Sequence, residues 1–409
     1  MNKIIIIGGG PSGMMAAIKA SENKNNSVTI IESNEKLGKK LFITGKGRCN
    51  LTNDKDISEF FEFIPGNPYF LYSSLYSFTN KDLMDFFVSK GIPLKVERGG
   101  RVFPESDKSS DILKILQKEI KNNDINVMLN SKVDKLIVKN NRVHKVLLTN
   151  GNEVKGDKFL IATGGRSYSQ TGSTGDGYKW AKQCGHNLEN IVPSLIPIEL
   201  EDQWVKNLQG LSLKNVDFTV VDKKTNKKVF AEFGEMLFTH YGVSGPIVLK
   251  ASRFINDKSS YKCIINLKPY YTEKELDNKL VDIFSQYLNK DFKNSLNDLL
   301  PSKIINTIIE LSRIDATKKV NSITKEERAN LVNILQNLEM NVKKLRPIDE
   351  AIITRGGVST KEIDPSTMQS KLVENLYFAG EIIDVDAFTG GFNLQIAFST
   401  GYIAGTNLD

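Results

Sequence analysis

The chain has 409 residues, of which 40% are hydrophobic and 25% are charged. This amino-acid composition is typical of a protein with a packed core, and it excludes a globally disordered chain. The 55 Lys and Arg residues exceed the 48 Asp and Glu residues by seven, which allows a basic face but does not require one. No apolar run reaches the roughly 18 residues of a membrane span, and the N-terminal start lacks a signal-peptide core. We expect a soluble cytoplasmic protein without a membrane partner.

Metal-ligating and disulfide-forming residues are rare. The three cysteines are Cys49, Cys184 and Cys263, and the three histidines are His144, His186 and His240. No two cysteines have the C-x-x-C spacing of a zinc or redox motif, and the histidines are far apart in the sequence. The sequence therefore predicts no metal site and no disulfide framework.

The first thirty residues have the pattern of a βαβ unit. Residues 4–7 form a β-branched run typical of a buried parallel strand. Residues 13–20 have the spacing of a helix, and residues 28–31 form a second strand. This order predicts a Rossmann-like fold at the N-terminus.

A glycine motif joins the first strand to the helix. In Gly8-x-Gly10-x-x-Gly13, the first glycine permits a tight turn, the second lets a pyrophosphate approach the backbone, and the third lets helix and strand pack closely. The helix amino end offers free N–H groups to the phosphates. Glu32 ends the second strand, where a carboxylate can accept hydrogen bonds from a ribose and would repel a 2′-phosphate. These features together predict a dinucleotide site.

The next segments are irregular and then β-rich. Residues 37–53 are glycine-rich and basic and are expected to form a long irregular loop, and residues 111–120 have helical spacing. Asn-Gly at residues 150–151 is a strong hairpin signal. Short strands are expected at residues 127–129, 133–138, 143–148 and 159–162.

The character of the chain changes near Pro193 and again after Pro347. Residues 194–270 contain alternating segments that predict a small β-rich part, whereas residues 271–347 have helical spacing. In that second part the apolar spacing predicts a helix that continues through Leu338. Strand and glycine signals then return.

A second glycine-rich loop near the C-terminus indicates a long cofactor. A strand at residues 376–379 leads to Gly380-Glu381 and then to the sequence TGGFNLQ at residues 389–395, where the last helix is expected to begin. A cofactor held at both ends of the chain must be long, and FAD is such a cofactor. Its adenosine would lie on the first βαβ unit and its flavin on the C-terminal loop.

The expected architecture follows from this. We predict an α/β protein with a Rossmann-like FAD-binding domain formed by both chain ends and interrupted by an insert domain. The expected parts are residues 1–193 and 348–409 for the FAD-binding domain, and residues 194–347 for the insert, with a β-rich part at 194–270 and a helical part at 271–347.

Several motifs resemble a family of bacterial NAD(P)/FAD-dependent oxidoreductases that includes bile-acid 4,6-reductase and aminoacetone oxidase. The similar segments are IIIIGGGPSGMMAA at 4–17, KLGKKLFITGKGRCNLTN at 36–53, GGRVFPESDKSSDI at 99–112, FLIATGGRSYSQTGSTGDGY at 159–178, GEMLFTHYGVSGPIVL at 234–249, and TRGGVSTKEIDPSTMQSK with LYFAGEIIDVDAFTGGFNLQIAFSTG at 354–401. They span nearly the whole chain. The resemblance implies a two-dinucleotide-binding-type flavoprotein with an insert domain.

The resemblance also implies which residues contact FAD. They are Gly8, Gly10, Ser12, Gly13, Glu32, Arg48, Asn50, Ala162, Thr163, Gly164, Gly380, Glu381, Asn393 and Leu394. Many other flavoproteins that grip FAD at both ends have Asp where this chain has Glu381, so the atom that this longer side chain contacts is left open.

Candidates for acid–base chemistry lie in the insert. Histidine is the side-chain type that titrates nearest neutral pH and tyrosine can donate a proton to a developing enolate, so His240 and Tyr241 are the catalytic candidates, with a structural histidine as the alternative. Cys49 has no second cysteine nearby, which favours a packing thiol over a redox thiol.

The expected function is an FAD-dependent oxidoreductase that transfers hydride through flavin N5 to or from a small molecule. The family implies two options, reduction of an enone C=C bond or oxidation of an amine. No second dinucleotide motif is present, so NADH or NADPH is expected only as a transient donor. The sequence does not predict the oligomeric state.

The alternative is a flavin-containing protein that associates with RNA without small-molecule turnover. It rests on the positive charge and on adjacent lysines in the insert, although solvated surface lysines are the more common explanation, so nucleic acid is the less favoured partner. These pairs are Lys223-Lys224, Lys227-Lys228, Lys318-Lys319 and Lys343-Lys344.

Overall fold

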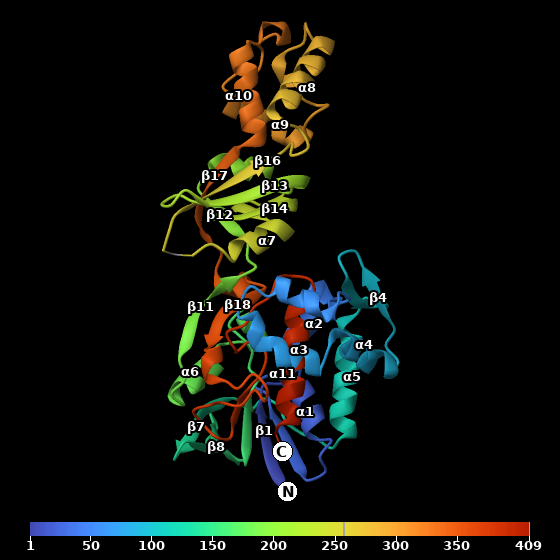
Figure 1. The fold of residues 1–409 in the computed structure, drawn as a ribbon, viewed down its shortest axis with the longest axis vertical. Helices are drawn as coiled ribbons and strands as arrows, with labels where there is room; N and C mark the ends of the chain where they lie inside the picture. The colour runs from blue at the N-terminus through green and yellow to red at the C-terminus, as the bar shows by residue number, and fades with distance from the viewer. Residues whose placement is uncertain (257, 409) are drawn as a thin grey trace. The chain divides into compact units, whose positions relative to one another are not determined.

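The computed structural model describes residues 1–256 and 258–408 (Figure 1). The chain divides into two compact units. The first, called the Rossmann unit, contains residues 1–193 and the segment that begins at Ile348, and the second, called the insert unit, spans Ser194–Pro347.

A five-stranded parallel sheet forms the centre of the Rossmann unit, in the order β19-β10-β1-β2-β6. Its strands are β1 (Asn2–Ile7), β2 (Asn26–Ile31), β6 (Asn126–Met128), β10 (Lys158–Ile161) and β19 (Leu376–Phe378). Ile7 at the end of β1 pairs with Ile31 on one side and Ile161 on the other. Three strands therefore end at one edge, and the residues that follow them face the place where α/β sheets bind ligands.

Two helices from opposite ends of the chain pack closely in this unit, α1 (Pro11–Ala20) and α11 (Phe392–Thr406). Glycines on α11 allow this contact, because a Cβ at Gly401 would lie 2.3 Å from the Ser12 carbonyl oxygen and one at Gly405 would lie 2.5 Å from that of Ala16. The C-terminal helix is thus fixed against the helix that follows the glycine motif.

Smaller elements complete the Rossmann unit. Its sheets are β3-β5-β4, β7-β8-β9 and β11-β18. The strands are β3 (Thr52–Asn53), β4 (Leu94–Glu97), β5 (Arg101–Pro104), β7 (Val133–Lys139), β8 (Arg142–Leu148), β9 (Glu153–Lys155), β11 (Leu188–Ser194) and β18 (Ile353–Val358). The helices are α2 (Lys39–Ile43), α3 (Tyr72–Ser77), α4 (Asn80–Ser89), α5 (Ser109–Asn122) and α6 (Asp176–Gln183). The loop expected at residues 37–53 therefore contains a short helix and strand, anchored by buried Leu41.

The insert unit is built on a closed barrel of six strands, in the order β12-β15-β14-β13-β16-β17. The strands are β12 (Ile198–Leu200), β13 (Ser212–Asp222), β14 (Lys227–Phe238), β15 (Gly242–Ser244), β16 (Tyr261–Asn266) and β17 (Leu338–Leu345). The helices are α7 (Pro246–Ser252), α8 (Glu273–Gln286), α9 (Ser302–Ser312) and α10 (Lys325–Gln336). The expected fold class, a Rossmann-like domain of both chain ends with a β-rich and helical insert, is confirmed.

One part of the prediction for the insert was wrong. The helix expected to continue through Leu338 ends at Gln336, and residues 338–345 form β17, a barrel strand paired with β12 and β16. Leu338 and Met340 are both buried, which is the alternation of a strand. Leu338 fits either period, so the local spacing did not reveal where the helix stops.

Candidate cofactor site

The glycine motif has the shape that a pyrophosphate requires. Gly8 has φ 111°, and a Cβ there would lie 2.5 Å from the Ala162 carbonyl oxygen, while one at Gly13 would lie 2.0 Å from that of Gly8. Gly10 is different, because a Cβ on it would meet open space. Gly10 caps α1 without a side-chain hydrogen bond, so no capping side chain occupies the amino end of this helix.

Glu32 lies at the end of β2 and is buried. Its Oε2 accepts a hydrogen bond from Gly9 N (2.8 Å), and its Oε1 accepts from Asn34 N (2.8 Å) and Asn34 Nδ2 (2.7 Å). The carboxylate thus joins the glycine motif to the β2 end. Oε2 retains a lone pair for one ribose hydroxyl.

The two expected cofactor segments meet beside α1. Ser12 Oγ donates to the Ala379 carbonyl oxygen at 3.5 Å, and a Cβ on Gly380 would lie 2.6 Å from Ser12 Oγ. Gly380 N in turn donates to Thr400 Oγ1 on α11 (3.0 Å). Residues that are more than 360 positions apart are therefore in direct contact.

The amino end of α11 meets the basic glycine-rich loop. Gly391 caps this helix with φ 102°, and a Cβ there would lie 2.2 Å from the Thr52 carbonyl oxygen. With the Asn50 amide oriented to satisfy both its ends, its oxygen accepts from Gly391 N (3.1 Å) and its nitrogen donates to Thr52 O (3.2 Å). Asn50 is thus held at the helix amino end.

The Asn393 side chain is used within the protein. Its Oδ1 accepts from Ala387 N (3.0 Å) and its Nδ2 donates to Ala387 O (2.7 Å), which closes the loop before α11. Leu394 is half-buried against the core of the Rossmann unit. Contacts of Asn393 and Leu394 with a flavin stay predictions.

Glu381 is bound by three groups that the sequence analysis did not identify. Its Oε2 accepts from Lys40 Nζ (2.8 Å), and its Oε1 accepts from Thr354 N (2.7 Å) and Ser167 Oγ (3.3 Å). Lys40 Nζ also donates to Ser167 Oγ (2.7 Å). The only sequence signal for Lys40 was its position in the basic loop, and its partners are 127 and 341 positions away.

Residues 162–164 follow β10 beside the glycine motif. Ala162 N donates to Ile7 O (2.9 Å), and Gly164 has φ 71°. The hydroxyl of Thr163 is buried without a hydrogen-bond partner in the described part of the chain, and a Cβ on Gly177 would lie 2.2 Å from it. Its side chain therefore points toward α6, so a cofactor contact of Thr163 would come from its backbone.

Arg48 has acidic partners of its own. Its guanidinium donates to Asp107 Oδ1 (2.6 Å) and Glu97 Oε1 (2.5 Å) and lies 4.2 Å from the Phe103 ring centroid. These hydrogen bonds raise the pKa of Arg48 and lower the pKa of Glu97, while hydrogen bonds from Lys95 and then Arg48 lower the pKa of Asp107. The side chain therefore ties the basic loop to the β4–β5 hairpin, and its predicted contact with FAD is untested.

The described residues fit FAD. Open space at Gly10 takes a pyrophosphate, buried Glu32 suits a ribose, and the amino end of α11 favours negative charge on a reduced flavin. Among residues 1–256 and 258–408, no group of three or more His, Cys, Asp or Glu side chains is arranged to hold a metal ion. No helix there is long and apolar enough to cross a membrane.

The cysteine thiols are buried. Burial raises the pKa of Cys49 to about 12 and that of Cys184 to about 11, and it also raises the pKa of Cys263. A thiol that stays protonated is a poor nucleophile. This supports the interpretation of Cys49 as a packing residue.

His240 and Tyr241 lie in the insert unit, between β14 and β15. Their ring centroids are 4.7 Å apart in an edge-on arrangement, and the Arg346 guanidinium lies 4.5 Å from the Tyr241 ring centroid. The His240 side chain is exposed and Tyr241 is half-buried. The structure brings the pair together, and its catalytic role stays a prediction.

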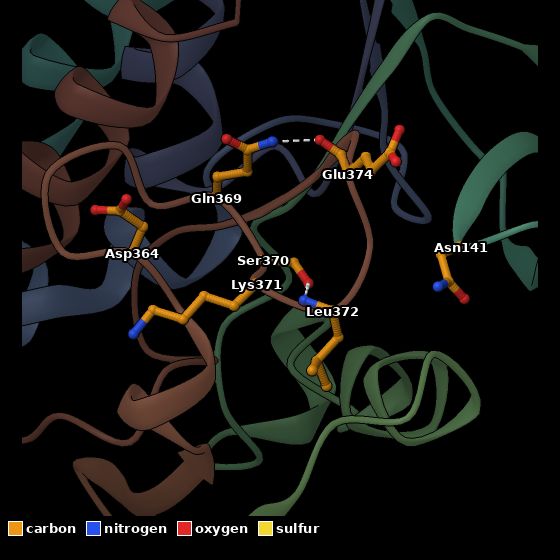
Figure 2. A pocket seen from close by; sticks show the side chains of 7 residues that line it. All are labelled: Asn141, Asp364, Gln369, Ser370, Lys371, Leu372 and Glu374. Carbon is orange, nitrogen blue, oxygen red and sulfur yellow. Dashed lines mark hydrogen bonds between the residues drawn. The ribbon is translucent and has the colours of Figure 1, made fainter.

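A polar cavity of about 430 Å³ lies elsewhere in the Rossmann unit. Figure 2 shows its lining, with Ser370 Oγ accepting from Leu372 N (3.0 Å) and Gln369 donating to the Glu374 carbonyl oxygen. Its lining residues are Asn141, Asp364, Gln369, Ser370, Lys371, Leu372 and Glu374. None of these is a residue predicted to bind FAD, so this cavity is separate from the candidate site.

The family assignment rests on a match over nearly the whole chain. The HI0933-like protein Rossmann domain matches residues 2–407. The chain belongs to this family. The family expected from the motifs is confirmed, and with it the class of the protein, an FAD-dependent oxidoreductase.

Curated relatives match this family member over nearly their full lengths. A 3-dehydro-bile acid delta(4,6)-reductase from Clostridium scindens is 30% identical, covering 99% of this chain and 98% of the relative. A ribosomal RNA dihydrouridine synthase from Escherichia coli is 31% identical, covering 99% and 97%. One of the same name from Haemophilus influenzae is 30% identical, covering 97% and 96%.

Solved structures share the fold. A 3-ketosteroid delta1-dehydrogenase from Sterolibacterium denitrificans superposes with a TM-score of 0.52 at 14% identity, covering 100% of this chain and 99% of that chain. A quinol-fumarate reductase superposes with a TM-score of 0.51 at 15% identity, covering 99% and 70%. At these identities the likeness concerns the fold alone.

Proposed function

We propose that this protein uses FAD to reduce a carbon–carbon double bond conjugated to a carbonyl. One observation carries the proposal: the names of the curated relatives give different substrates, but in each substrate a C=C bond conjugated to a carbonyl is reduced. A delta(4,6)-reductase of a 3-dehydro-bile acid acts beside a ketone, and dihydrouridine is uridine with the double bond beside its C4 carbonyl saturated. One relative is named a reductase and two are named for forming dihydrouridine, the reduced form of uridine, which favours this reaction over amine oxidation.

The chain supplies binding, electrostatics and a proton. Bound FAD, once reduced by a nicotinamide donor, would supply the hydride. Glu32 and the amino end of α1 hold the adenosine end, and the amino end of α11 favours negative charge near Gly391. Reduction also needs a proton at the carbon next to the carbonyl, and we assign it to His240 or Tyr241.

We propose uridine in ribosomal RNA as the first substrate candidate. Two relatives carry that activity in their names. Most of the net positive charge also lies in the insert unit. Residues 194–347 hold 24 of the 55 basic and 19 of the 48 acidic residues, which gives five of the seven net positive charges. Positive charge favours binding of a polyanion such as RNA. The alternative drawn from the sequence was an RNA-associated flavoprotein without turnover. The present proposal differs from it, because here RNA is the substrate of the reaction.

The second candidate is a steroid-like enone. The bile-acid reductase favours it, since it matches this chain over 99% of its length at 30% identity. In both cases we propose NADH or NADPH as the transient electron donor. No second dinucleotide motif provides a permanent site for it.

The test begins with the flavin. Acid release from the purified protein should yield FAD, and recovery of FMN, or of no flavin after reconstitution, would overturn the proposal. Anaerobic mixing with NADH and NADPH should then bleach the flavin absorbance.

The reduced protein is next mixed with RNA transcribed in vitro from a ribosomal RNA gene, and separately with a 3-keto-4,6-diene steroid. Flavin reoxidation together with a product two hydrogens heavier identifies the substrate. If neither substrate reoxidises the flavin, the proposed reaction is wrong.

A further inference from the structure

Four pairs of adjacent lysines stand out in the insert unit, and the structure separates them by their partners. Lysines 318, 319, 343 and 344 are bound to carboxylates. Their ion pairs are Lys318–Glu327 (2.7 Å), Lys319–Asp291 (2.8 Å), Lys343–Glu199 (2.9 Å) and Lys344–Glu199 (3.8 Å). Lys318 and Lys319 therefore each have a carboxylate of their own, whereas Lys343 and Lys344 share the single charge of Glu199 with Arg346 (3.5 Å), so the charge of this pair is compensated only in part.

The other two pairs form the tip of the β13–β14 hairpin (Figure 1). Lys223, Lys224, Lys227 and Lys228 are all exposed, and none has a carboxylate within ion-pair distance in the part of the chain that the structure describes. Lys223 Nζ donates to Asn341 Oδ1 (2.5 Å) and Lys224 Nζ donates to the Lys258 carbonyl oxygen (2.7 Å). Neutral acceptors hold these two ammonium groups without cancelling their charge.

Asp222 is the acidic residue at this tip, and its carboxylate is used by the turn. Its Oδ1 accepts from Ser259 Oγ (2.7 Å), Lys224 N (2.8 Å) and Thr225 N (3.2 Å). These hydrogen bonds to Asp222 stabilise the conformation of the turn. The backbone of the exposed Lys258 lies beside the tip, because its carbonyl oxygen accepts the hydrogen bond from Lys224 Nζ.

We propose that this hairpin tip, residues 222–228 with Lys258, docks the phosphate backbone of RNA. The inference rests on the proposed RNA substrate and adds the surface that would hold it. Lysines bind phosphates through charge, without reading sequence. Residues 222–228 contain only Asp, Lys, Thr and Asn, so the tip lacks the apolar side chains with which a helix or loop anchors in a lipid interface.

The test compares two variants that lose the same charge. The tip variant carries Lys223→Gln, Lys224→Gln, Lys227→Gln and Lys228→Gln. The control carries Lys318→Gln, Lys319→Gln, Lys343→Gln and Lys344→Gln. Binding of each FAD-loaded protein to the ribosomal RNA transcript is measured over a series of salt concentrations, and FAD content and melting temperature confirm that both variants fold.

We expect the tip variant to bind more weakly at every salt concentration, with a log Kd against log salt slope that is less steep by about 3, since four phosphate contacts are lost. The control should change this slope by less than half as much. An equal loss in both variants, or no loss in the tip variant, would overturn the docking surface. Tighter binding to phosphatidylglycerol vesicles than to RNA would overturn it as well.

Dihydrouridine in the transcript, measured in the same samples, separates this proposal from the proposed function. If the wild type forms dihydrouridine and the tip variant does so with an unchanged KM, the substrate stands and the docking surface fails. If the wild type binds RNA through the tip but forms no dihydrouridine, the docking surface stands and the proposed substrate fails.

Discussion

Gly10 and Gly13 belong to one motif but serve different partners. A Cβ on Gly10 meets no protein atom within 4 Å, whereas one on Gly13 would lie 2.0 Å from the Gly8 carbonyl oxygen. Gly10 has φ −79° and ψ −178°, a conformation that valine adopts readily. The requirement for glycine at position 10 therefore comes from the ligand, and at position 13 from the fold.

Gly10→Val should abolish FAD retention while leaving the melting temperature of the FAD-free protein unchanged. The side chain fills the space that a pyrophosphate needs, and its Cβ meets no protein atom within 4 Å. Gly13→Val is the contrast, since its side chain collides with backbone and should prevent folding. Flavin absorbance and thermal unfolding measure both. A Gly10→Val protein that keeps its FAD would disprove the pyrophosphate assignment.

Glu32→Ala should weaken FAD binding less severely than Gly10→Val. It removes charged hydrogen bonds worth about 1–3 kcal/mol, which corresponds to a rise in Kd of roughly 5- to 150-fold. Glu32→Gln keeps an acceptor for Gly9 N, so its Kd for FAD should lie between those of the wild type and Glu32→Ala. Titration of the FAD-free proteins gives the Kd values, and wild-type affinity in Glu32→Ala would place the ribose elsewhere.

His186 should make stability depend on pH. Its Nε2 lies 2.9 Å from Ser370 Oγ, and burial lowers its pKa below the ordinary value of 6.5, although Glu362 opposes this shift. The unfolded chain therefore binds a proton near pH 6.5 that the folded chain does not. This contribution to stability is complete above about pH 6.5 and is lost as the pH falls toward the folded pKa.

The His186→Gln variant tests this dependence. Its free energy of unfolding in urea should fall less than that of the wild type between about pH 7.5 and about pH 5.5. His144→Gln, which changes an exposed histidine, is the control and should follow the wild type. Parallel pH curves for all three proteins would refute the role of His186.

At the scale of elements, the α2 segment and the turn after β19 are joined by Lys40 and Glu381. Both side chains are about one-fifth exposed, so the pair is partly shielded from solvent. Lys40 also bonds to Ser167, and Glu381 also bonds to the Thr354 backbone. The network connects segments from both ends of the chain at the expected flavin side of the site.

Lys40→Met should raise the Kd for FAD by roughly 3- to 10-fold, which corresponds to about 1 kcal/mol. The cause is lost positioning of Glu381. In a double-mutant cycle with Glu381→Gln, the two losses should not add, with a coupling of about 1 kcal/mol. Lys114→Met removes an exposed ion pair on α5 and should leave the Kd unchanged. Additive losses would show that Lys40 and Glu381 act independently.

At the scale of the whole molecule, the Rossmann unit carries the residues predicted to bind FAD and the insert unit carries the proposed acid. His240→Ala and Tyr241→Phe should therefore keep FAD content and the flavin spectrum while slowing flavin reoxidation by substrate. A histidine acting in proton transfer contributes typically about 10²- to 10⁴-fold. Single-turnover rates from about pH 5 to about pH 9 measure this effect. Unchanged rates would remove His240 from the mechanism, and loss of flavin would assign it to the cofactor site.

Features that depend on neighbouring residues could be predicted from the sequence. The βαβ unit, the glycine motif and the second glycine loop were readable because strand period and glycine requirements are local. The strand at residues 338–345 was not readable, because Leu338 fits a helix and a strand equally well. Only pairing with β12 and β16 decides between them.

Tertiary structure alone decided which charges are compensated. In the sequence, Lys40 was one cation in a basic loop, and the four lysine pairs of the insert looked alike. Lys40 meets Glu381, which is 341 positions away, and Lys319 meets Asp291, which is 28 positions away, whereas the hairpin-tip lysines meet no described carboxylate. An ion pair depends on a distance of a few ångströms in space, and separation along the chain does not set that distance.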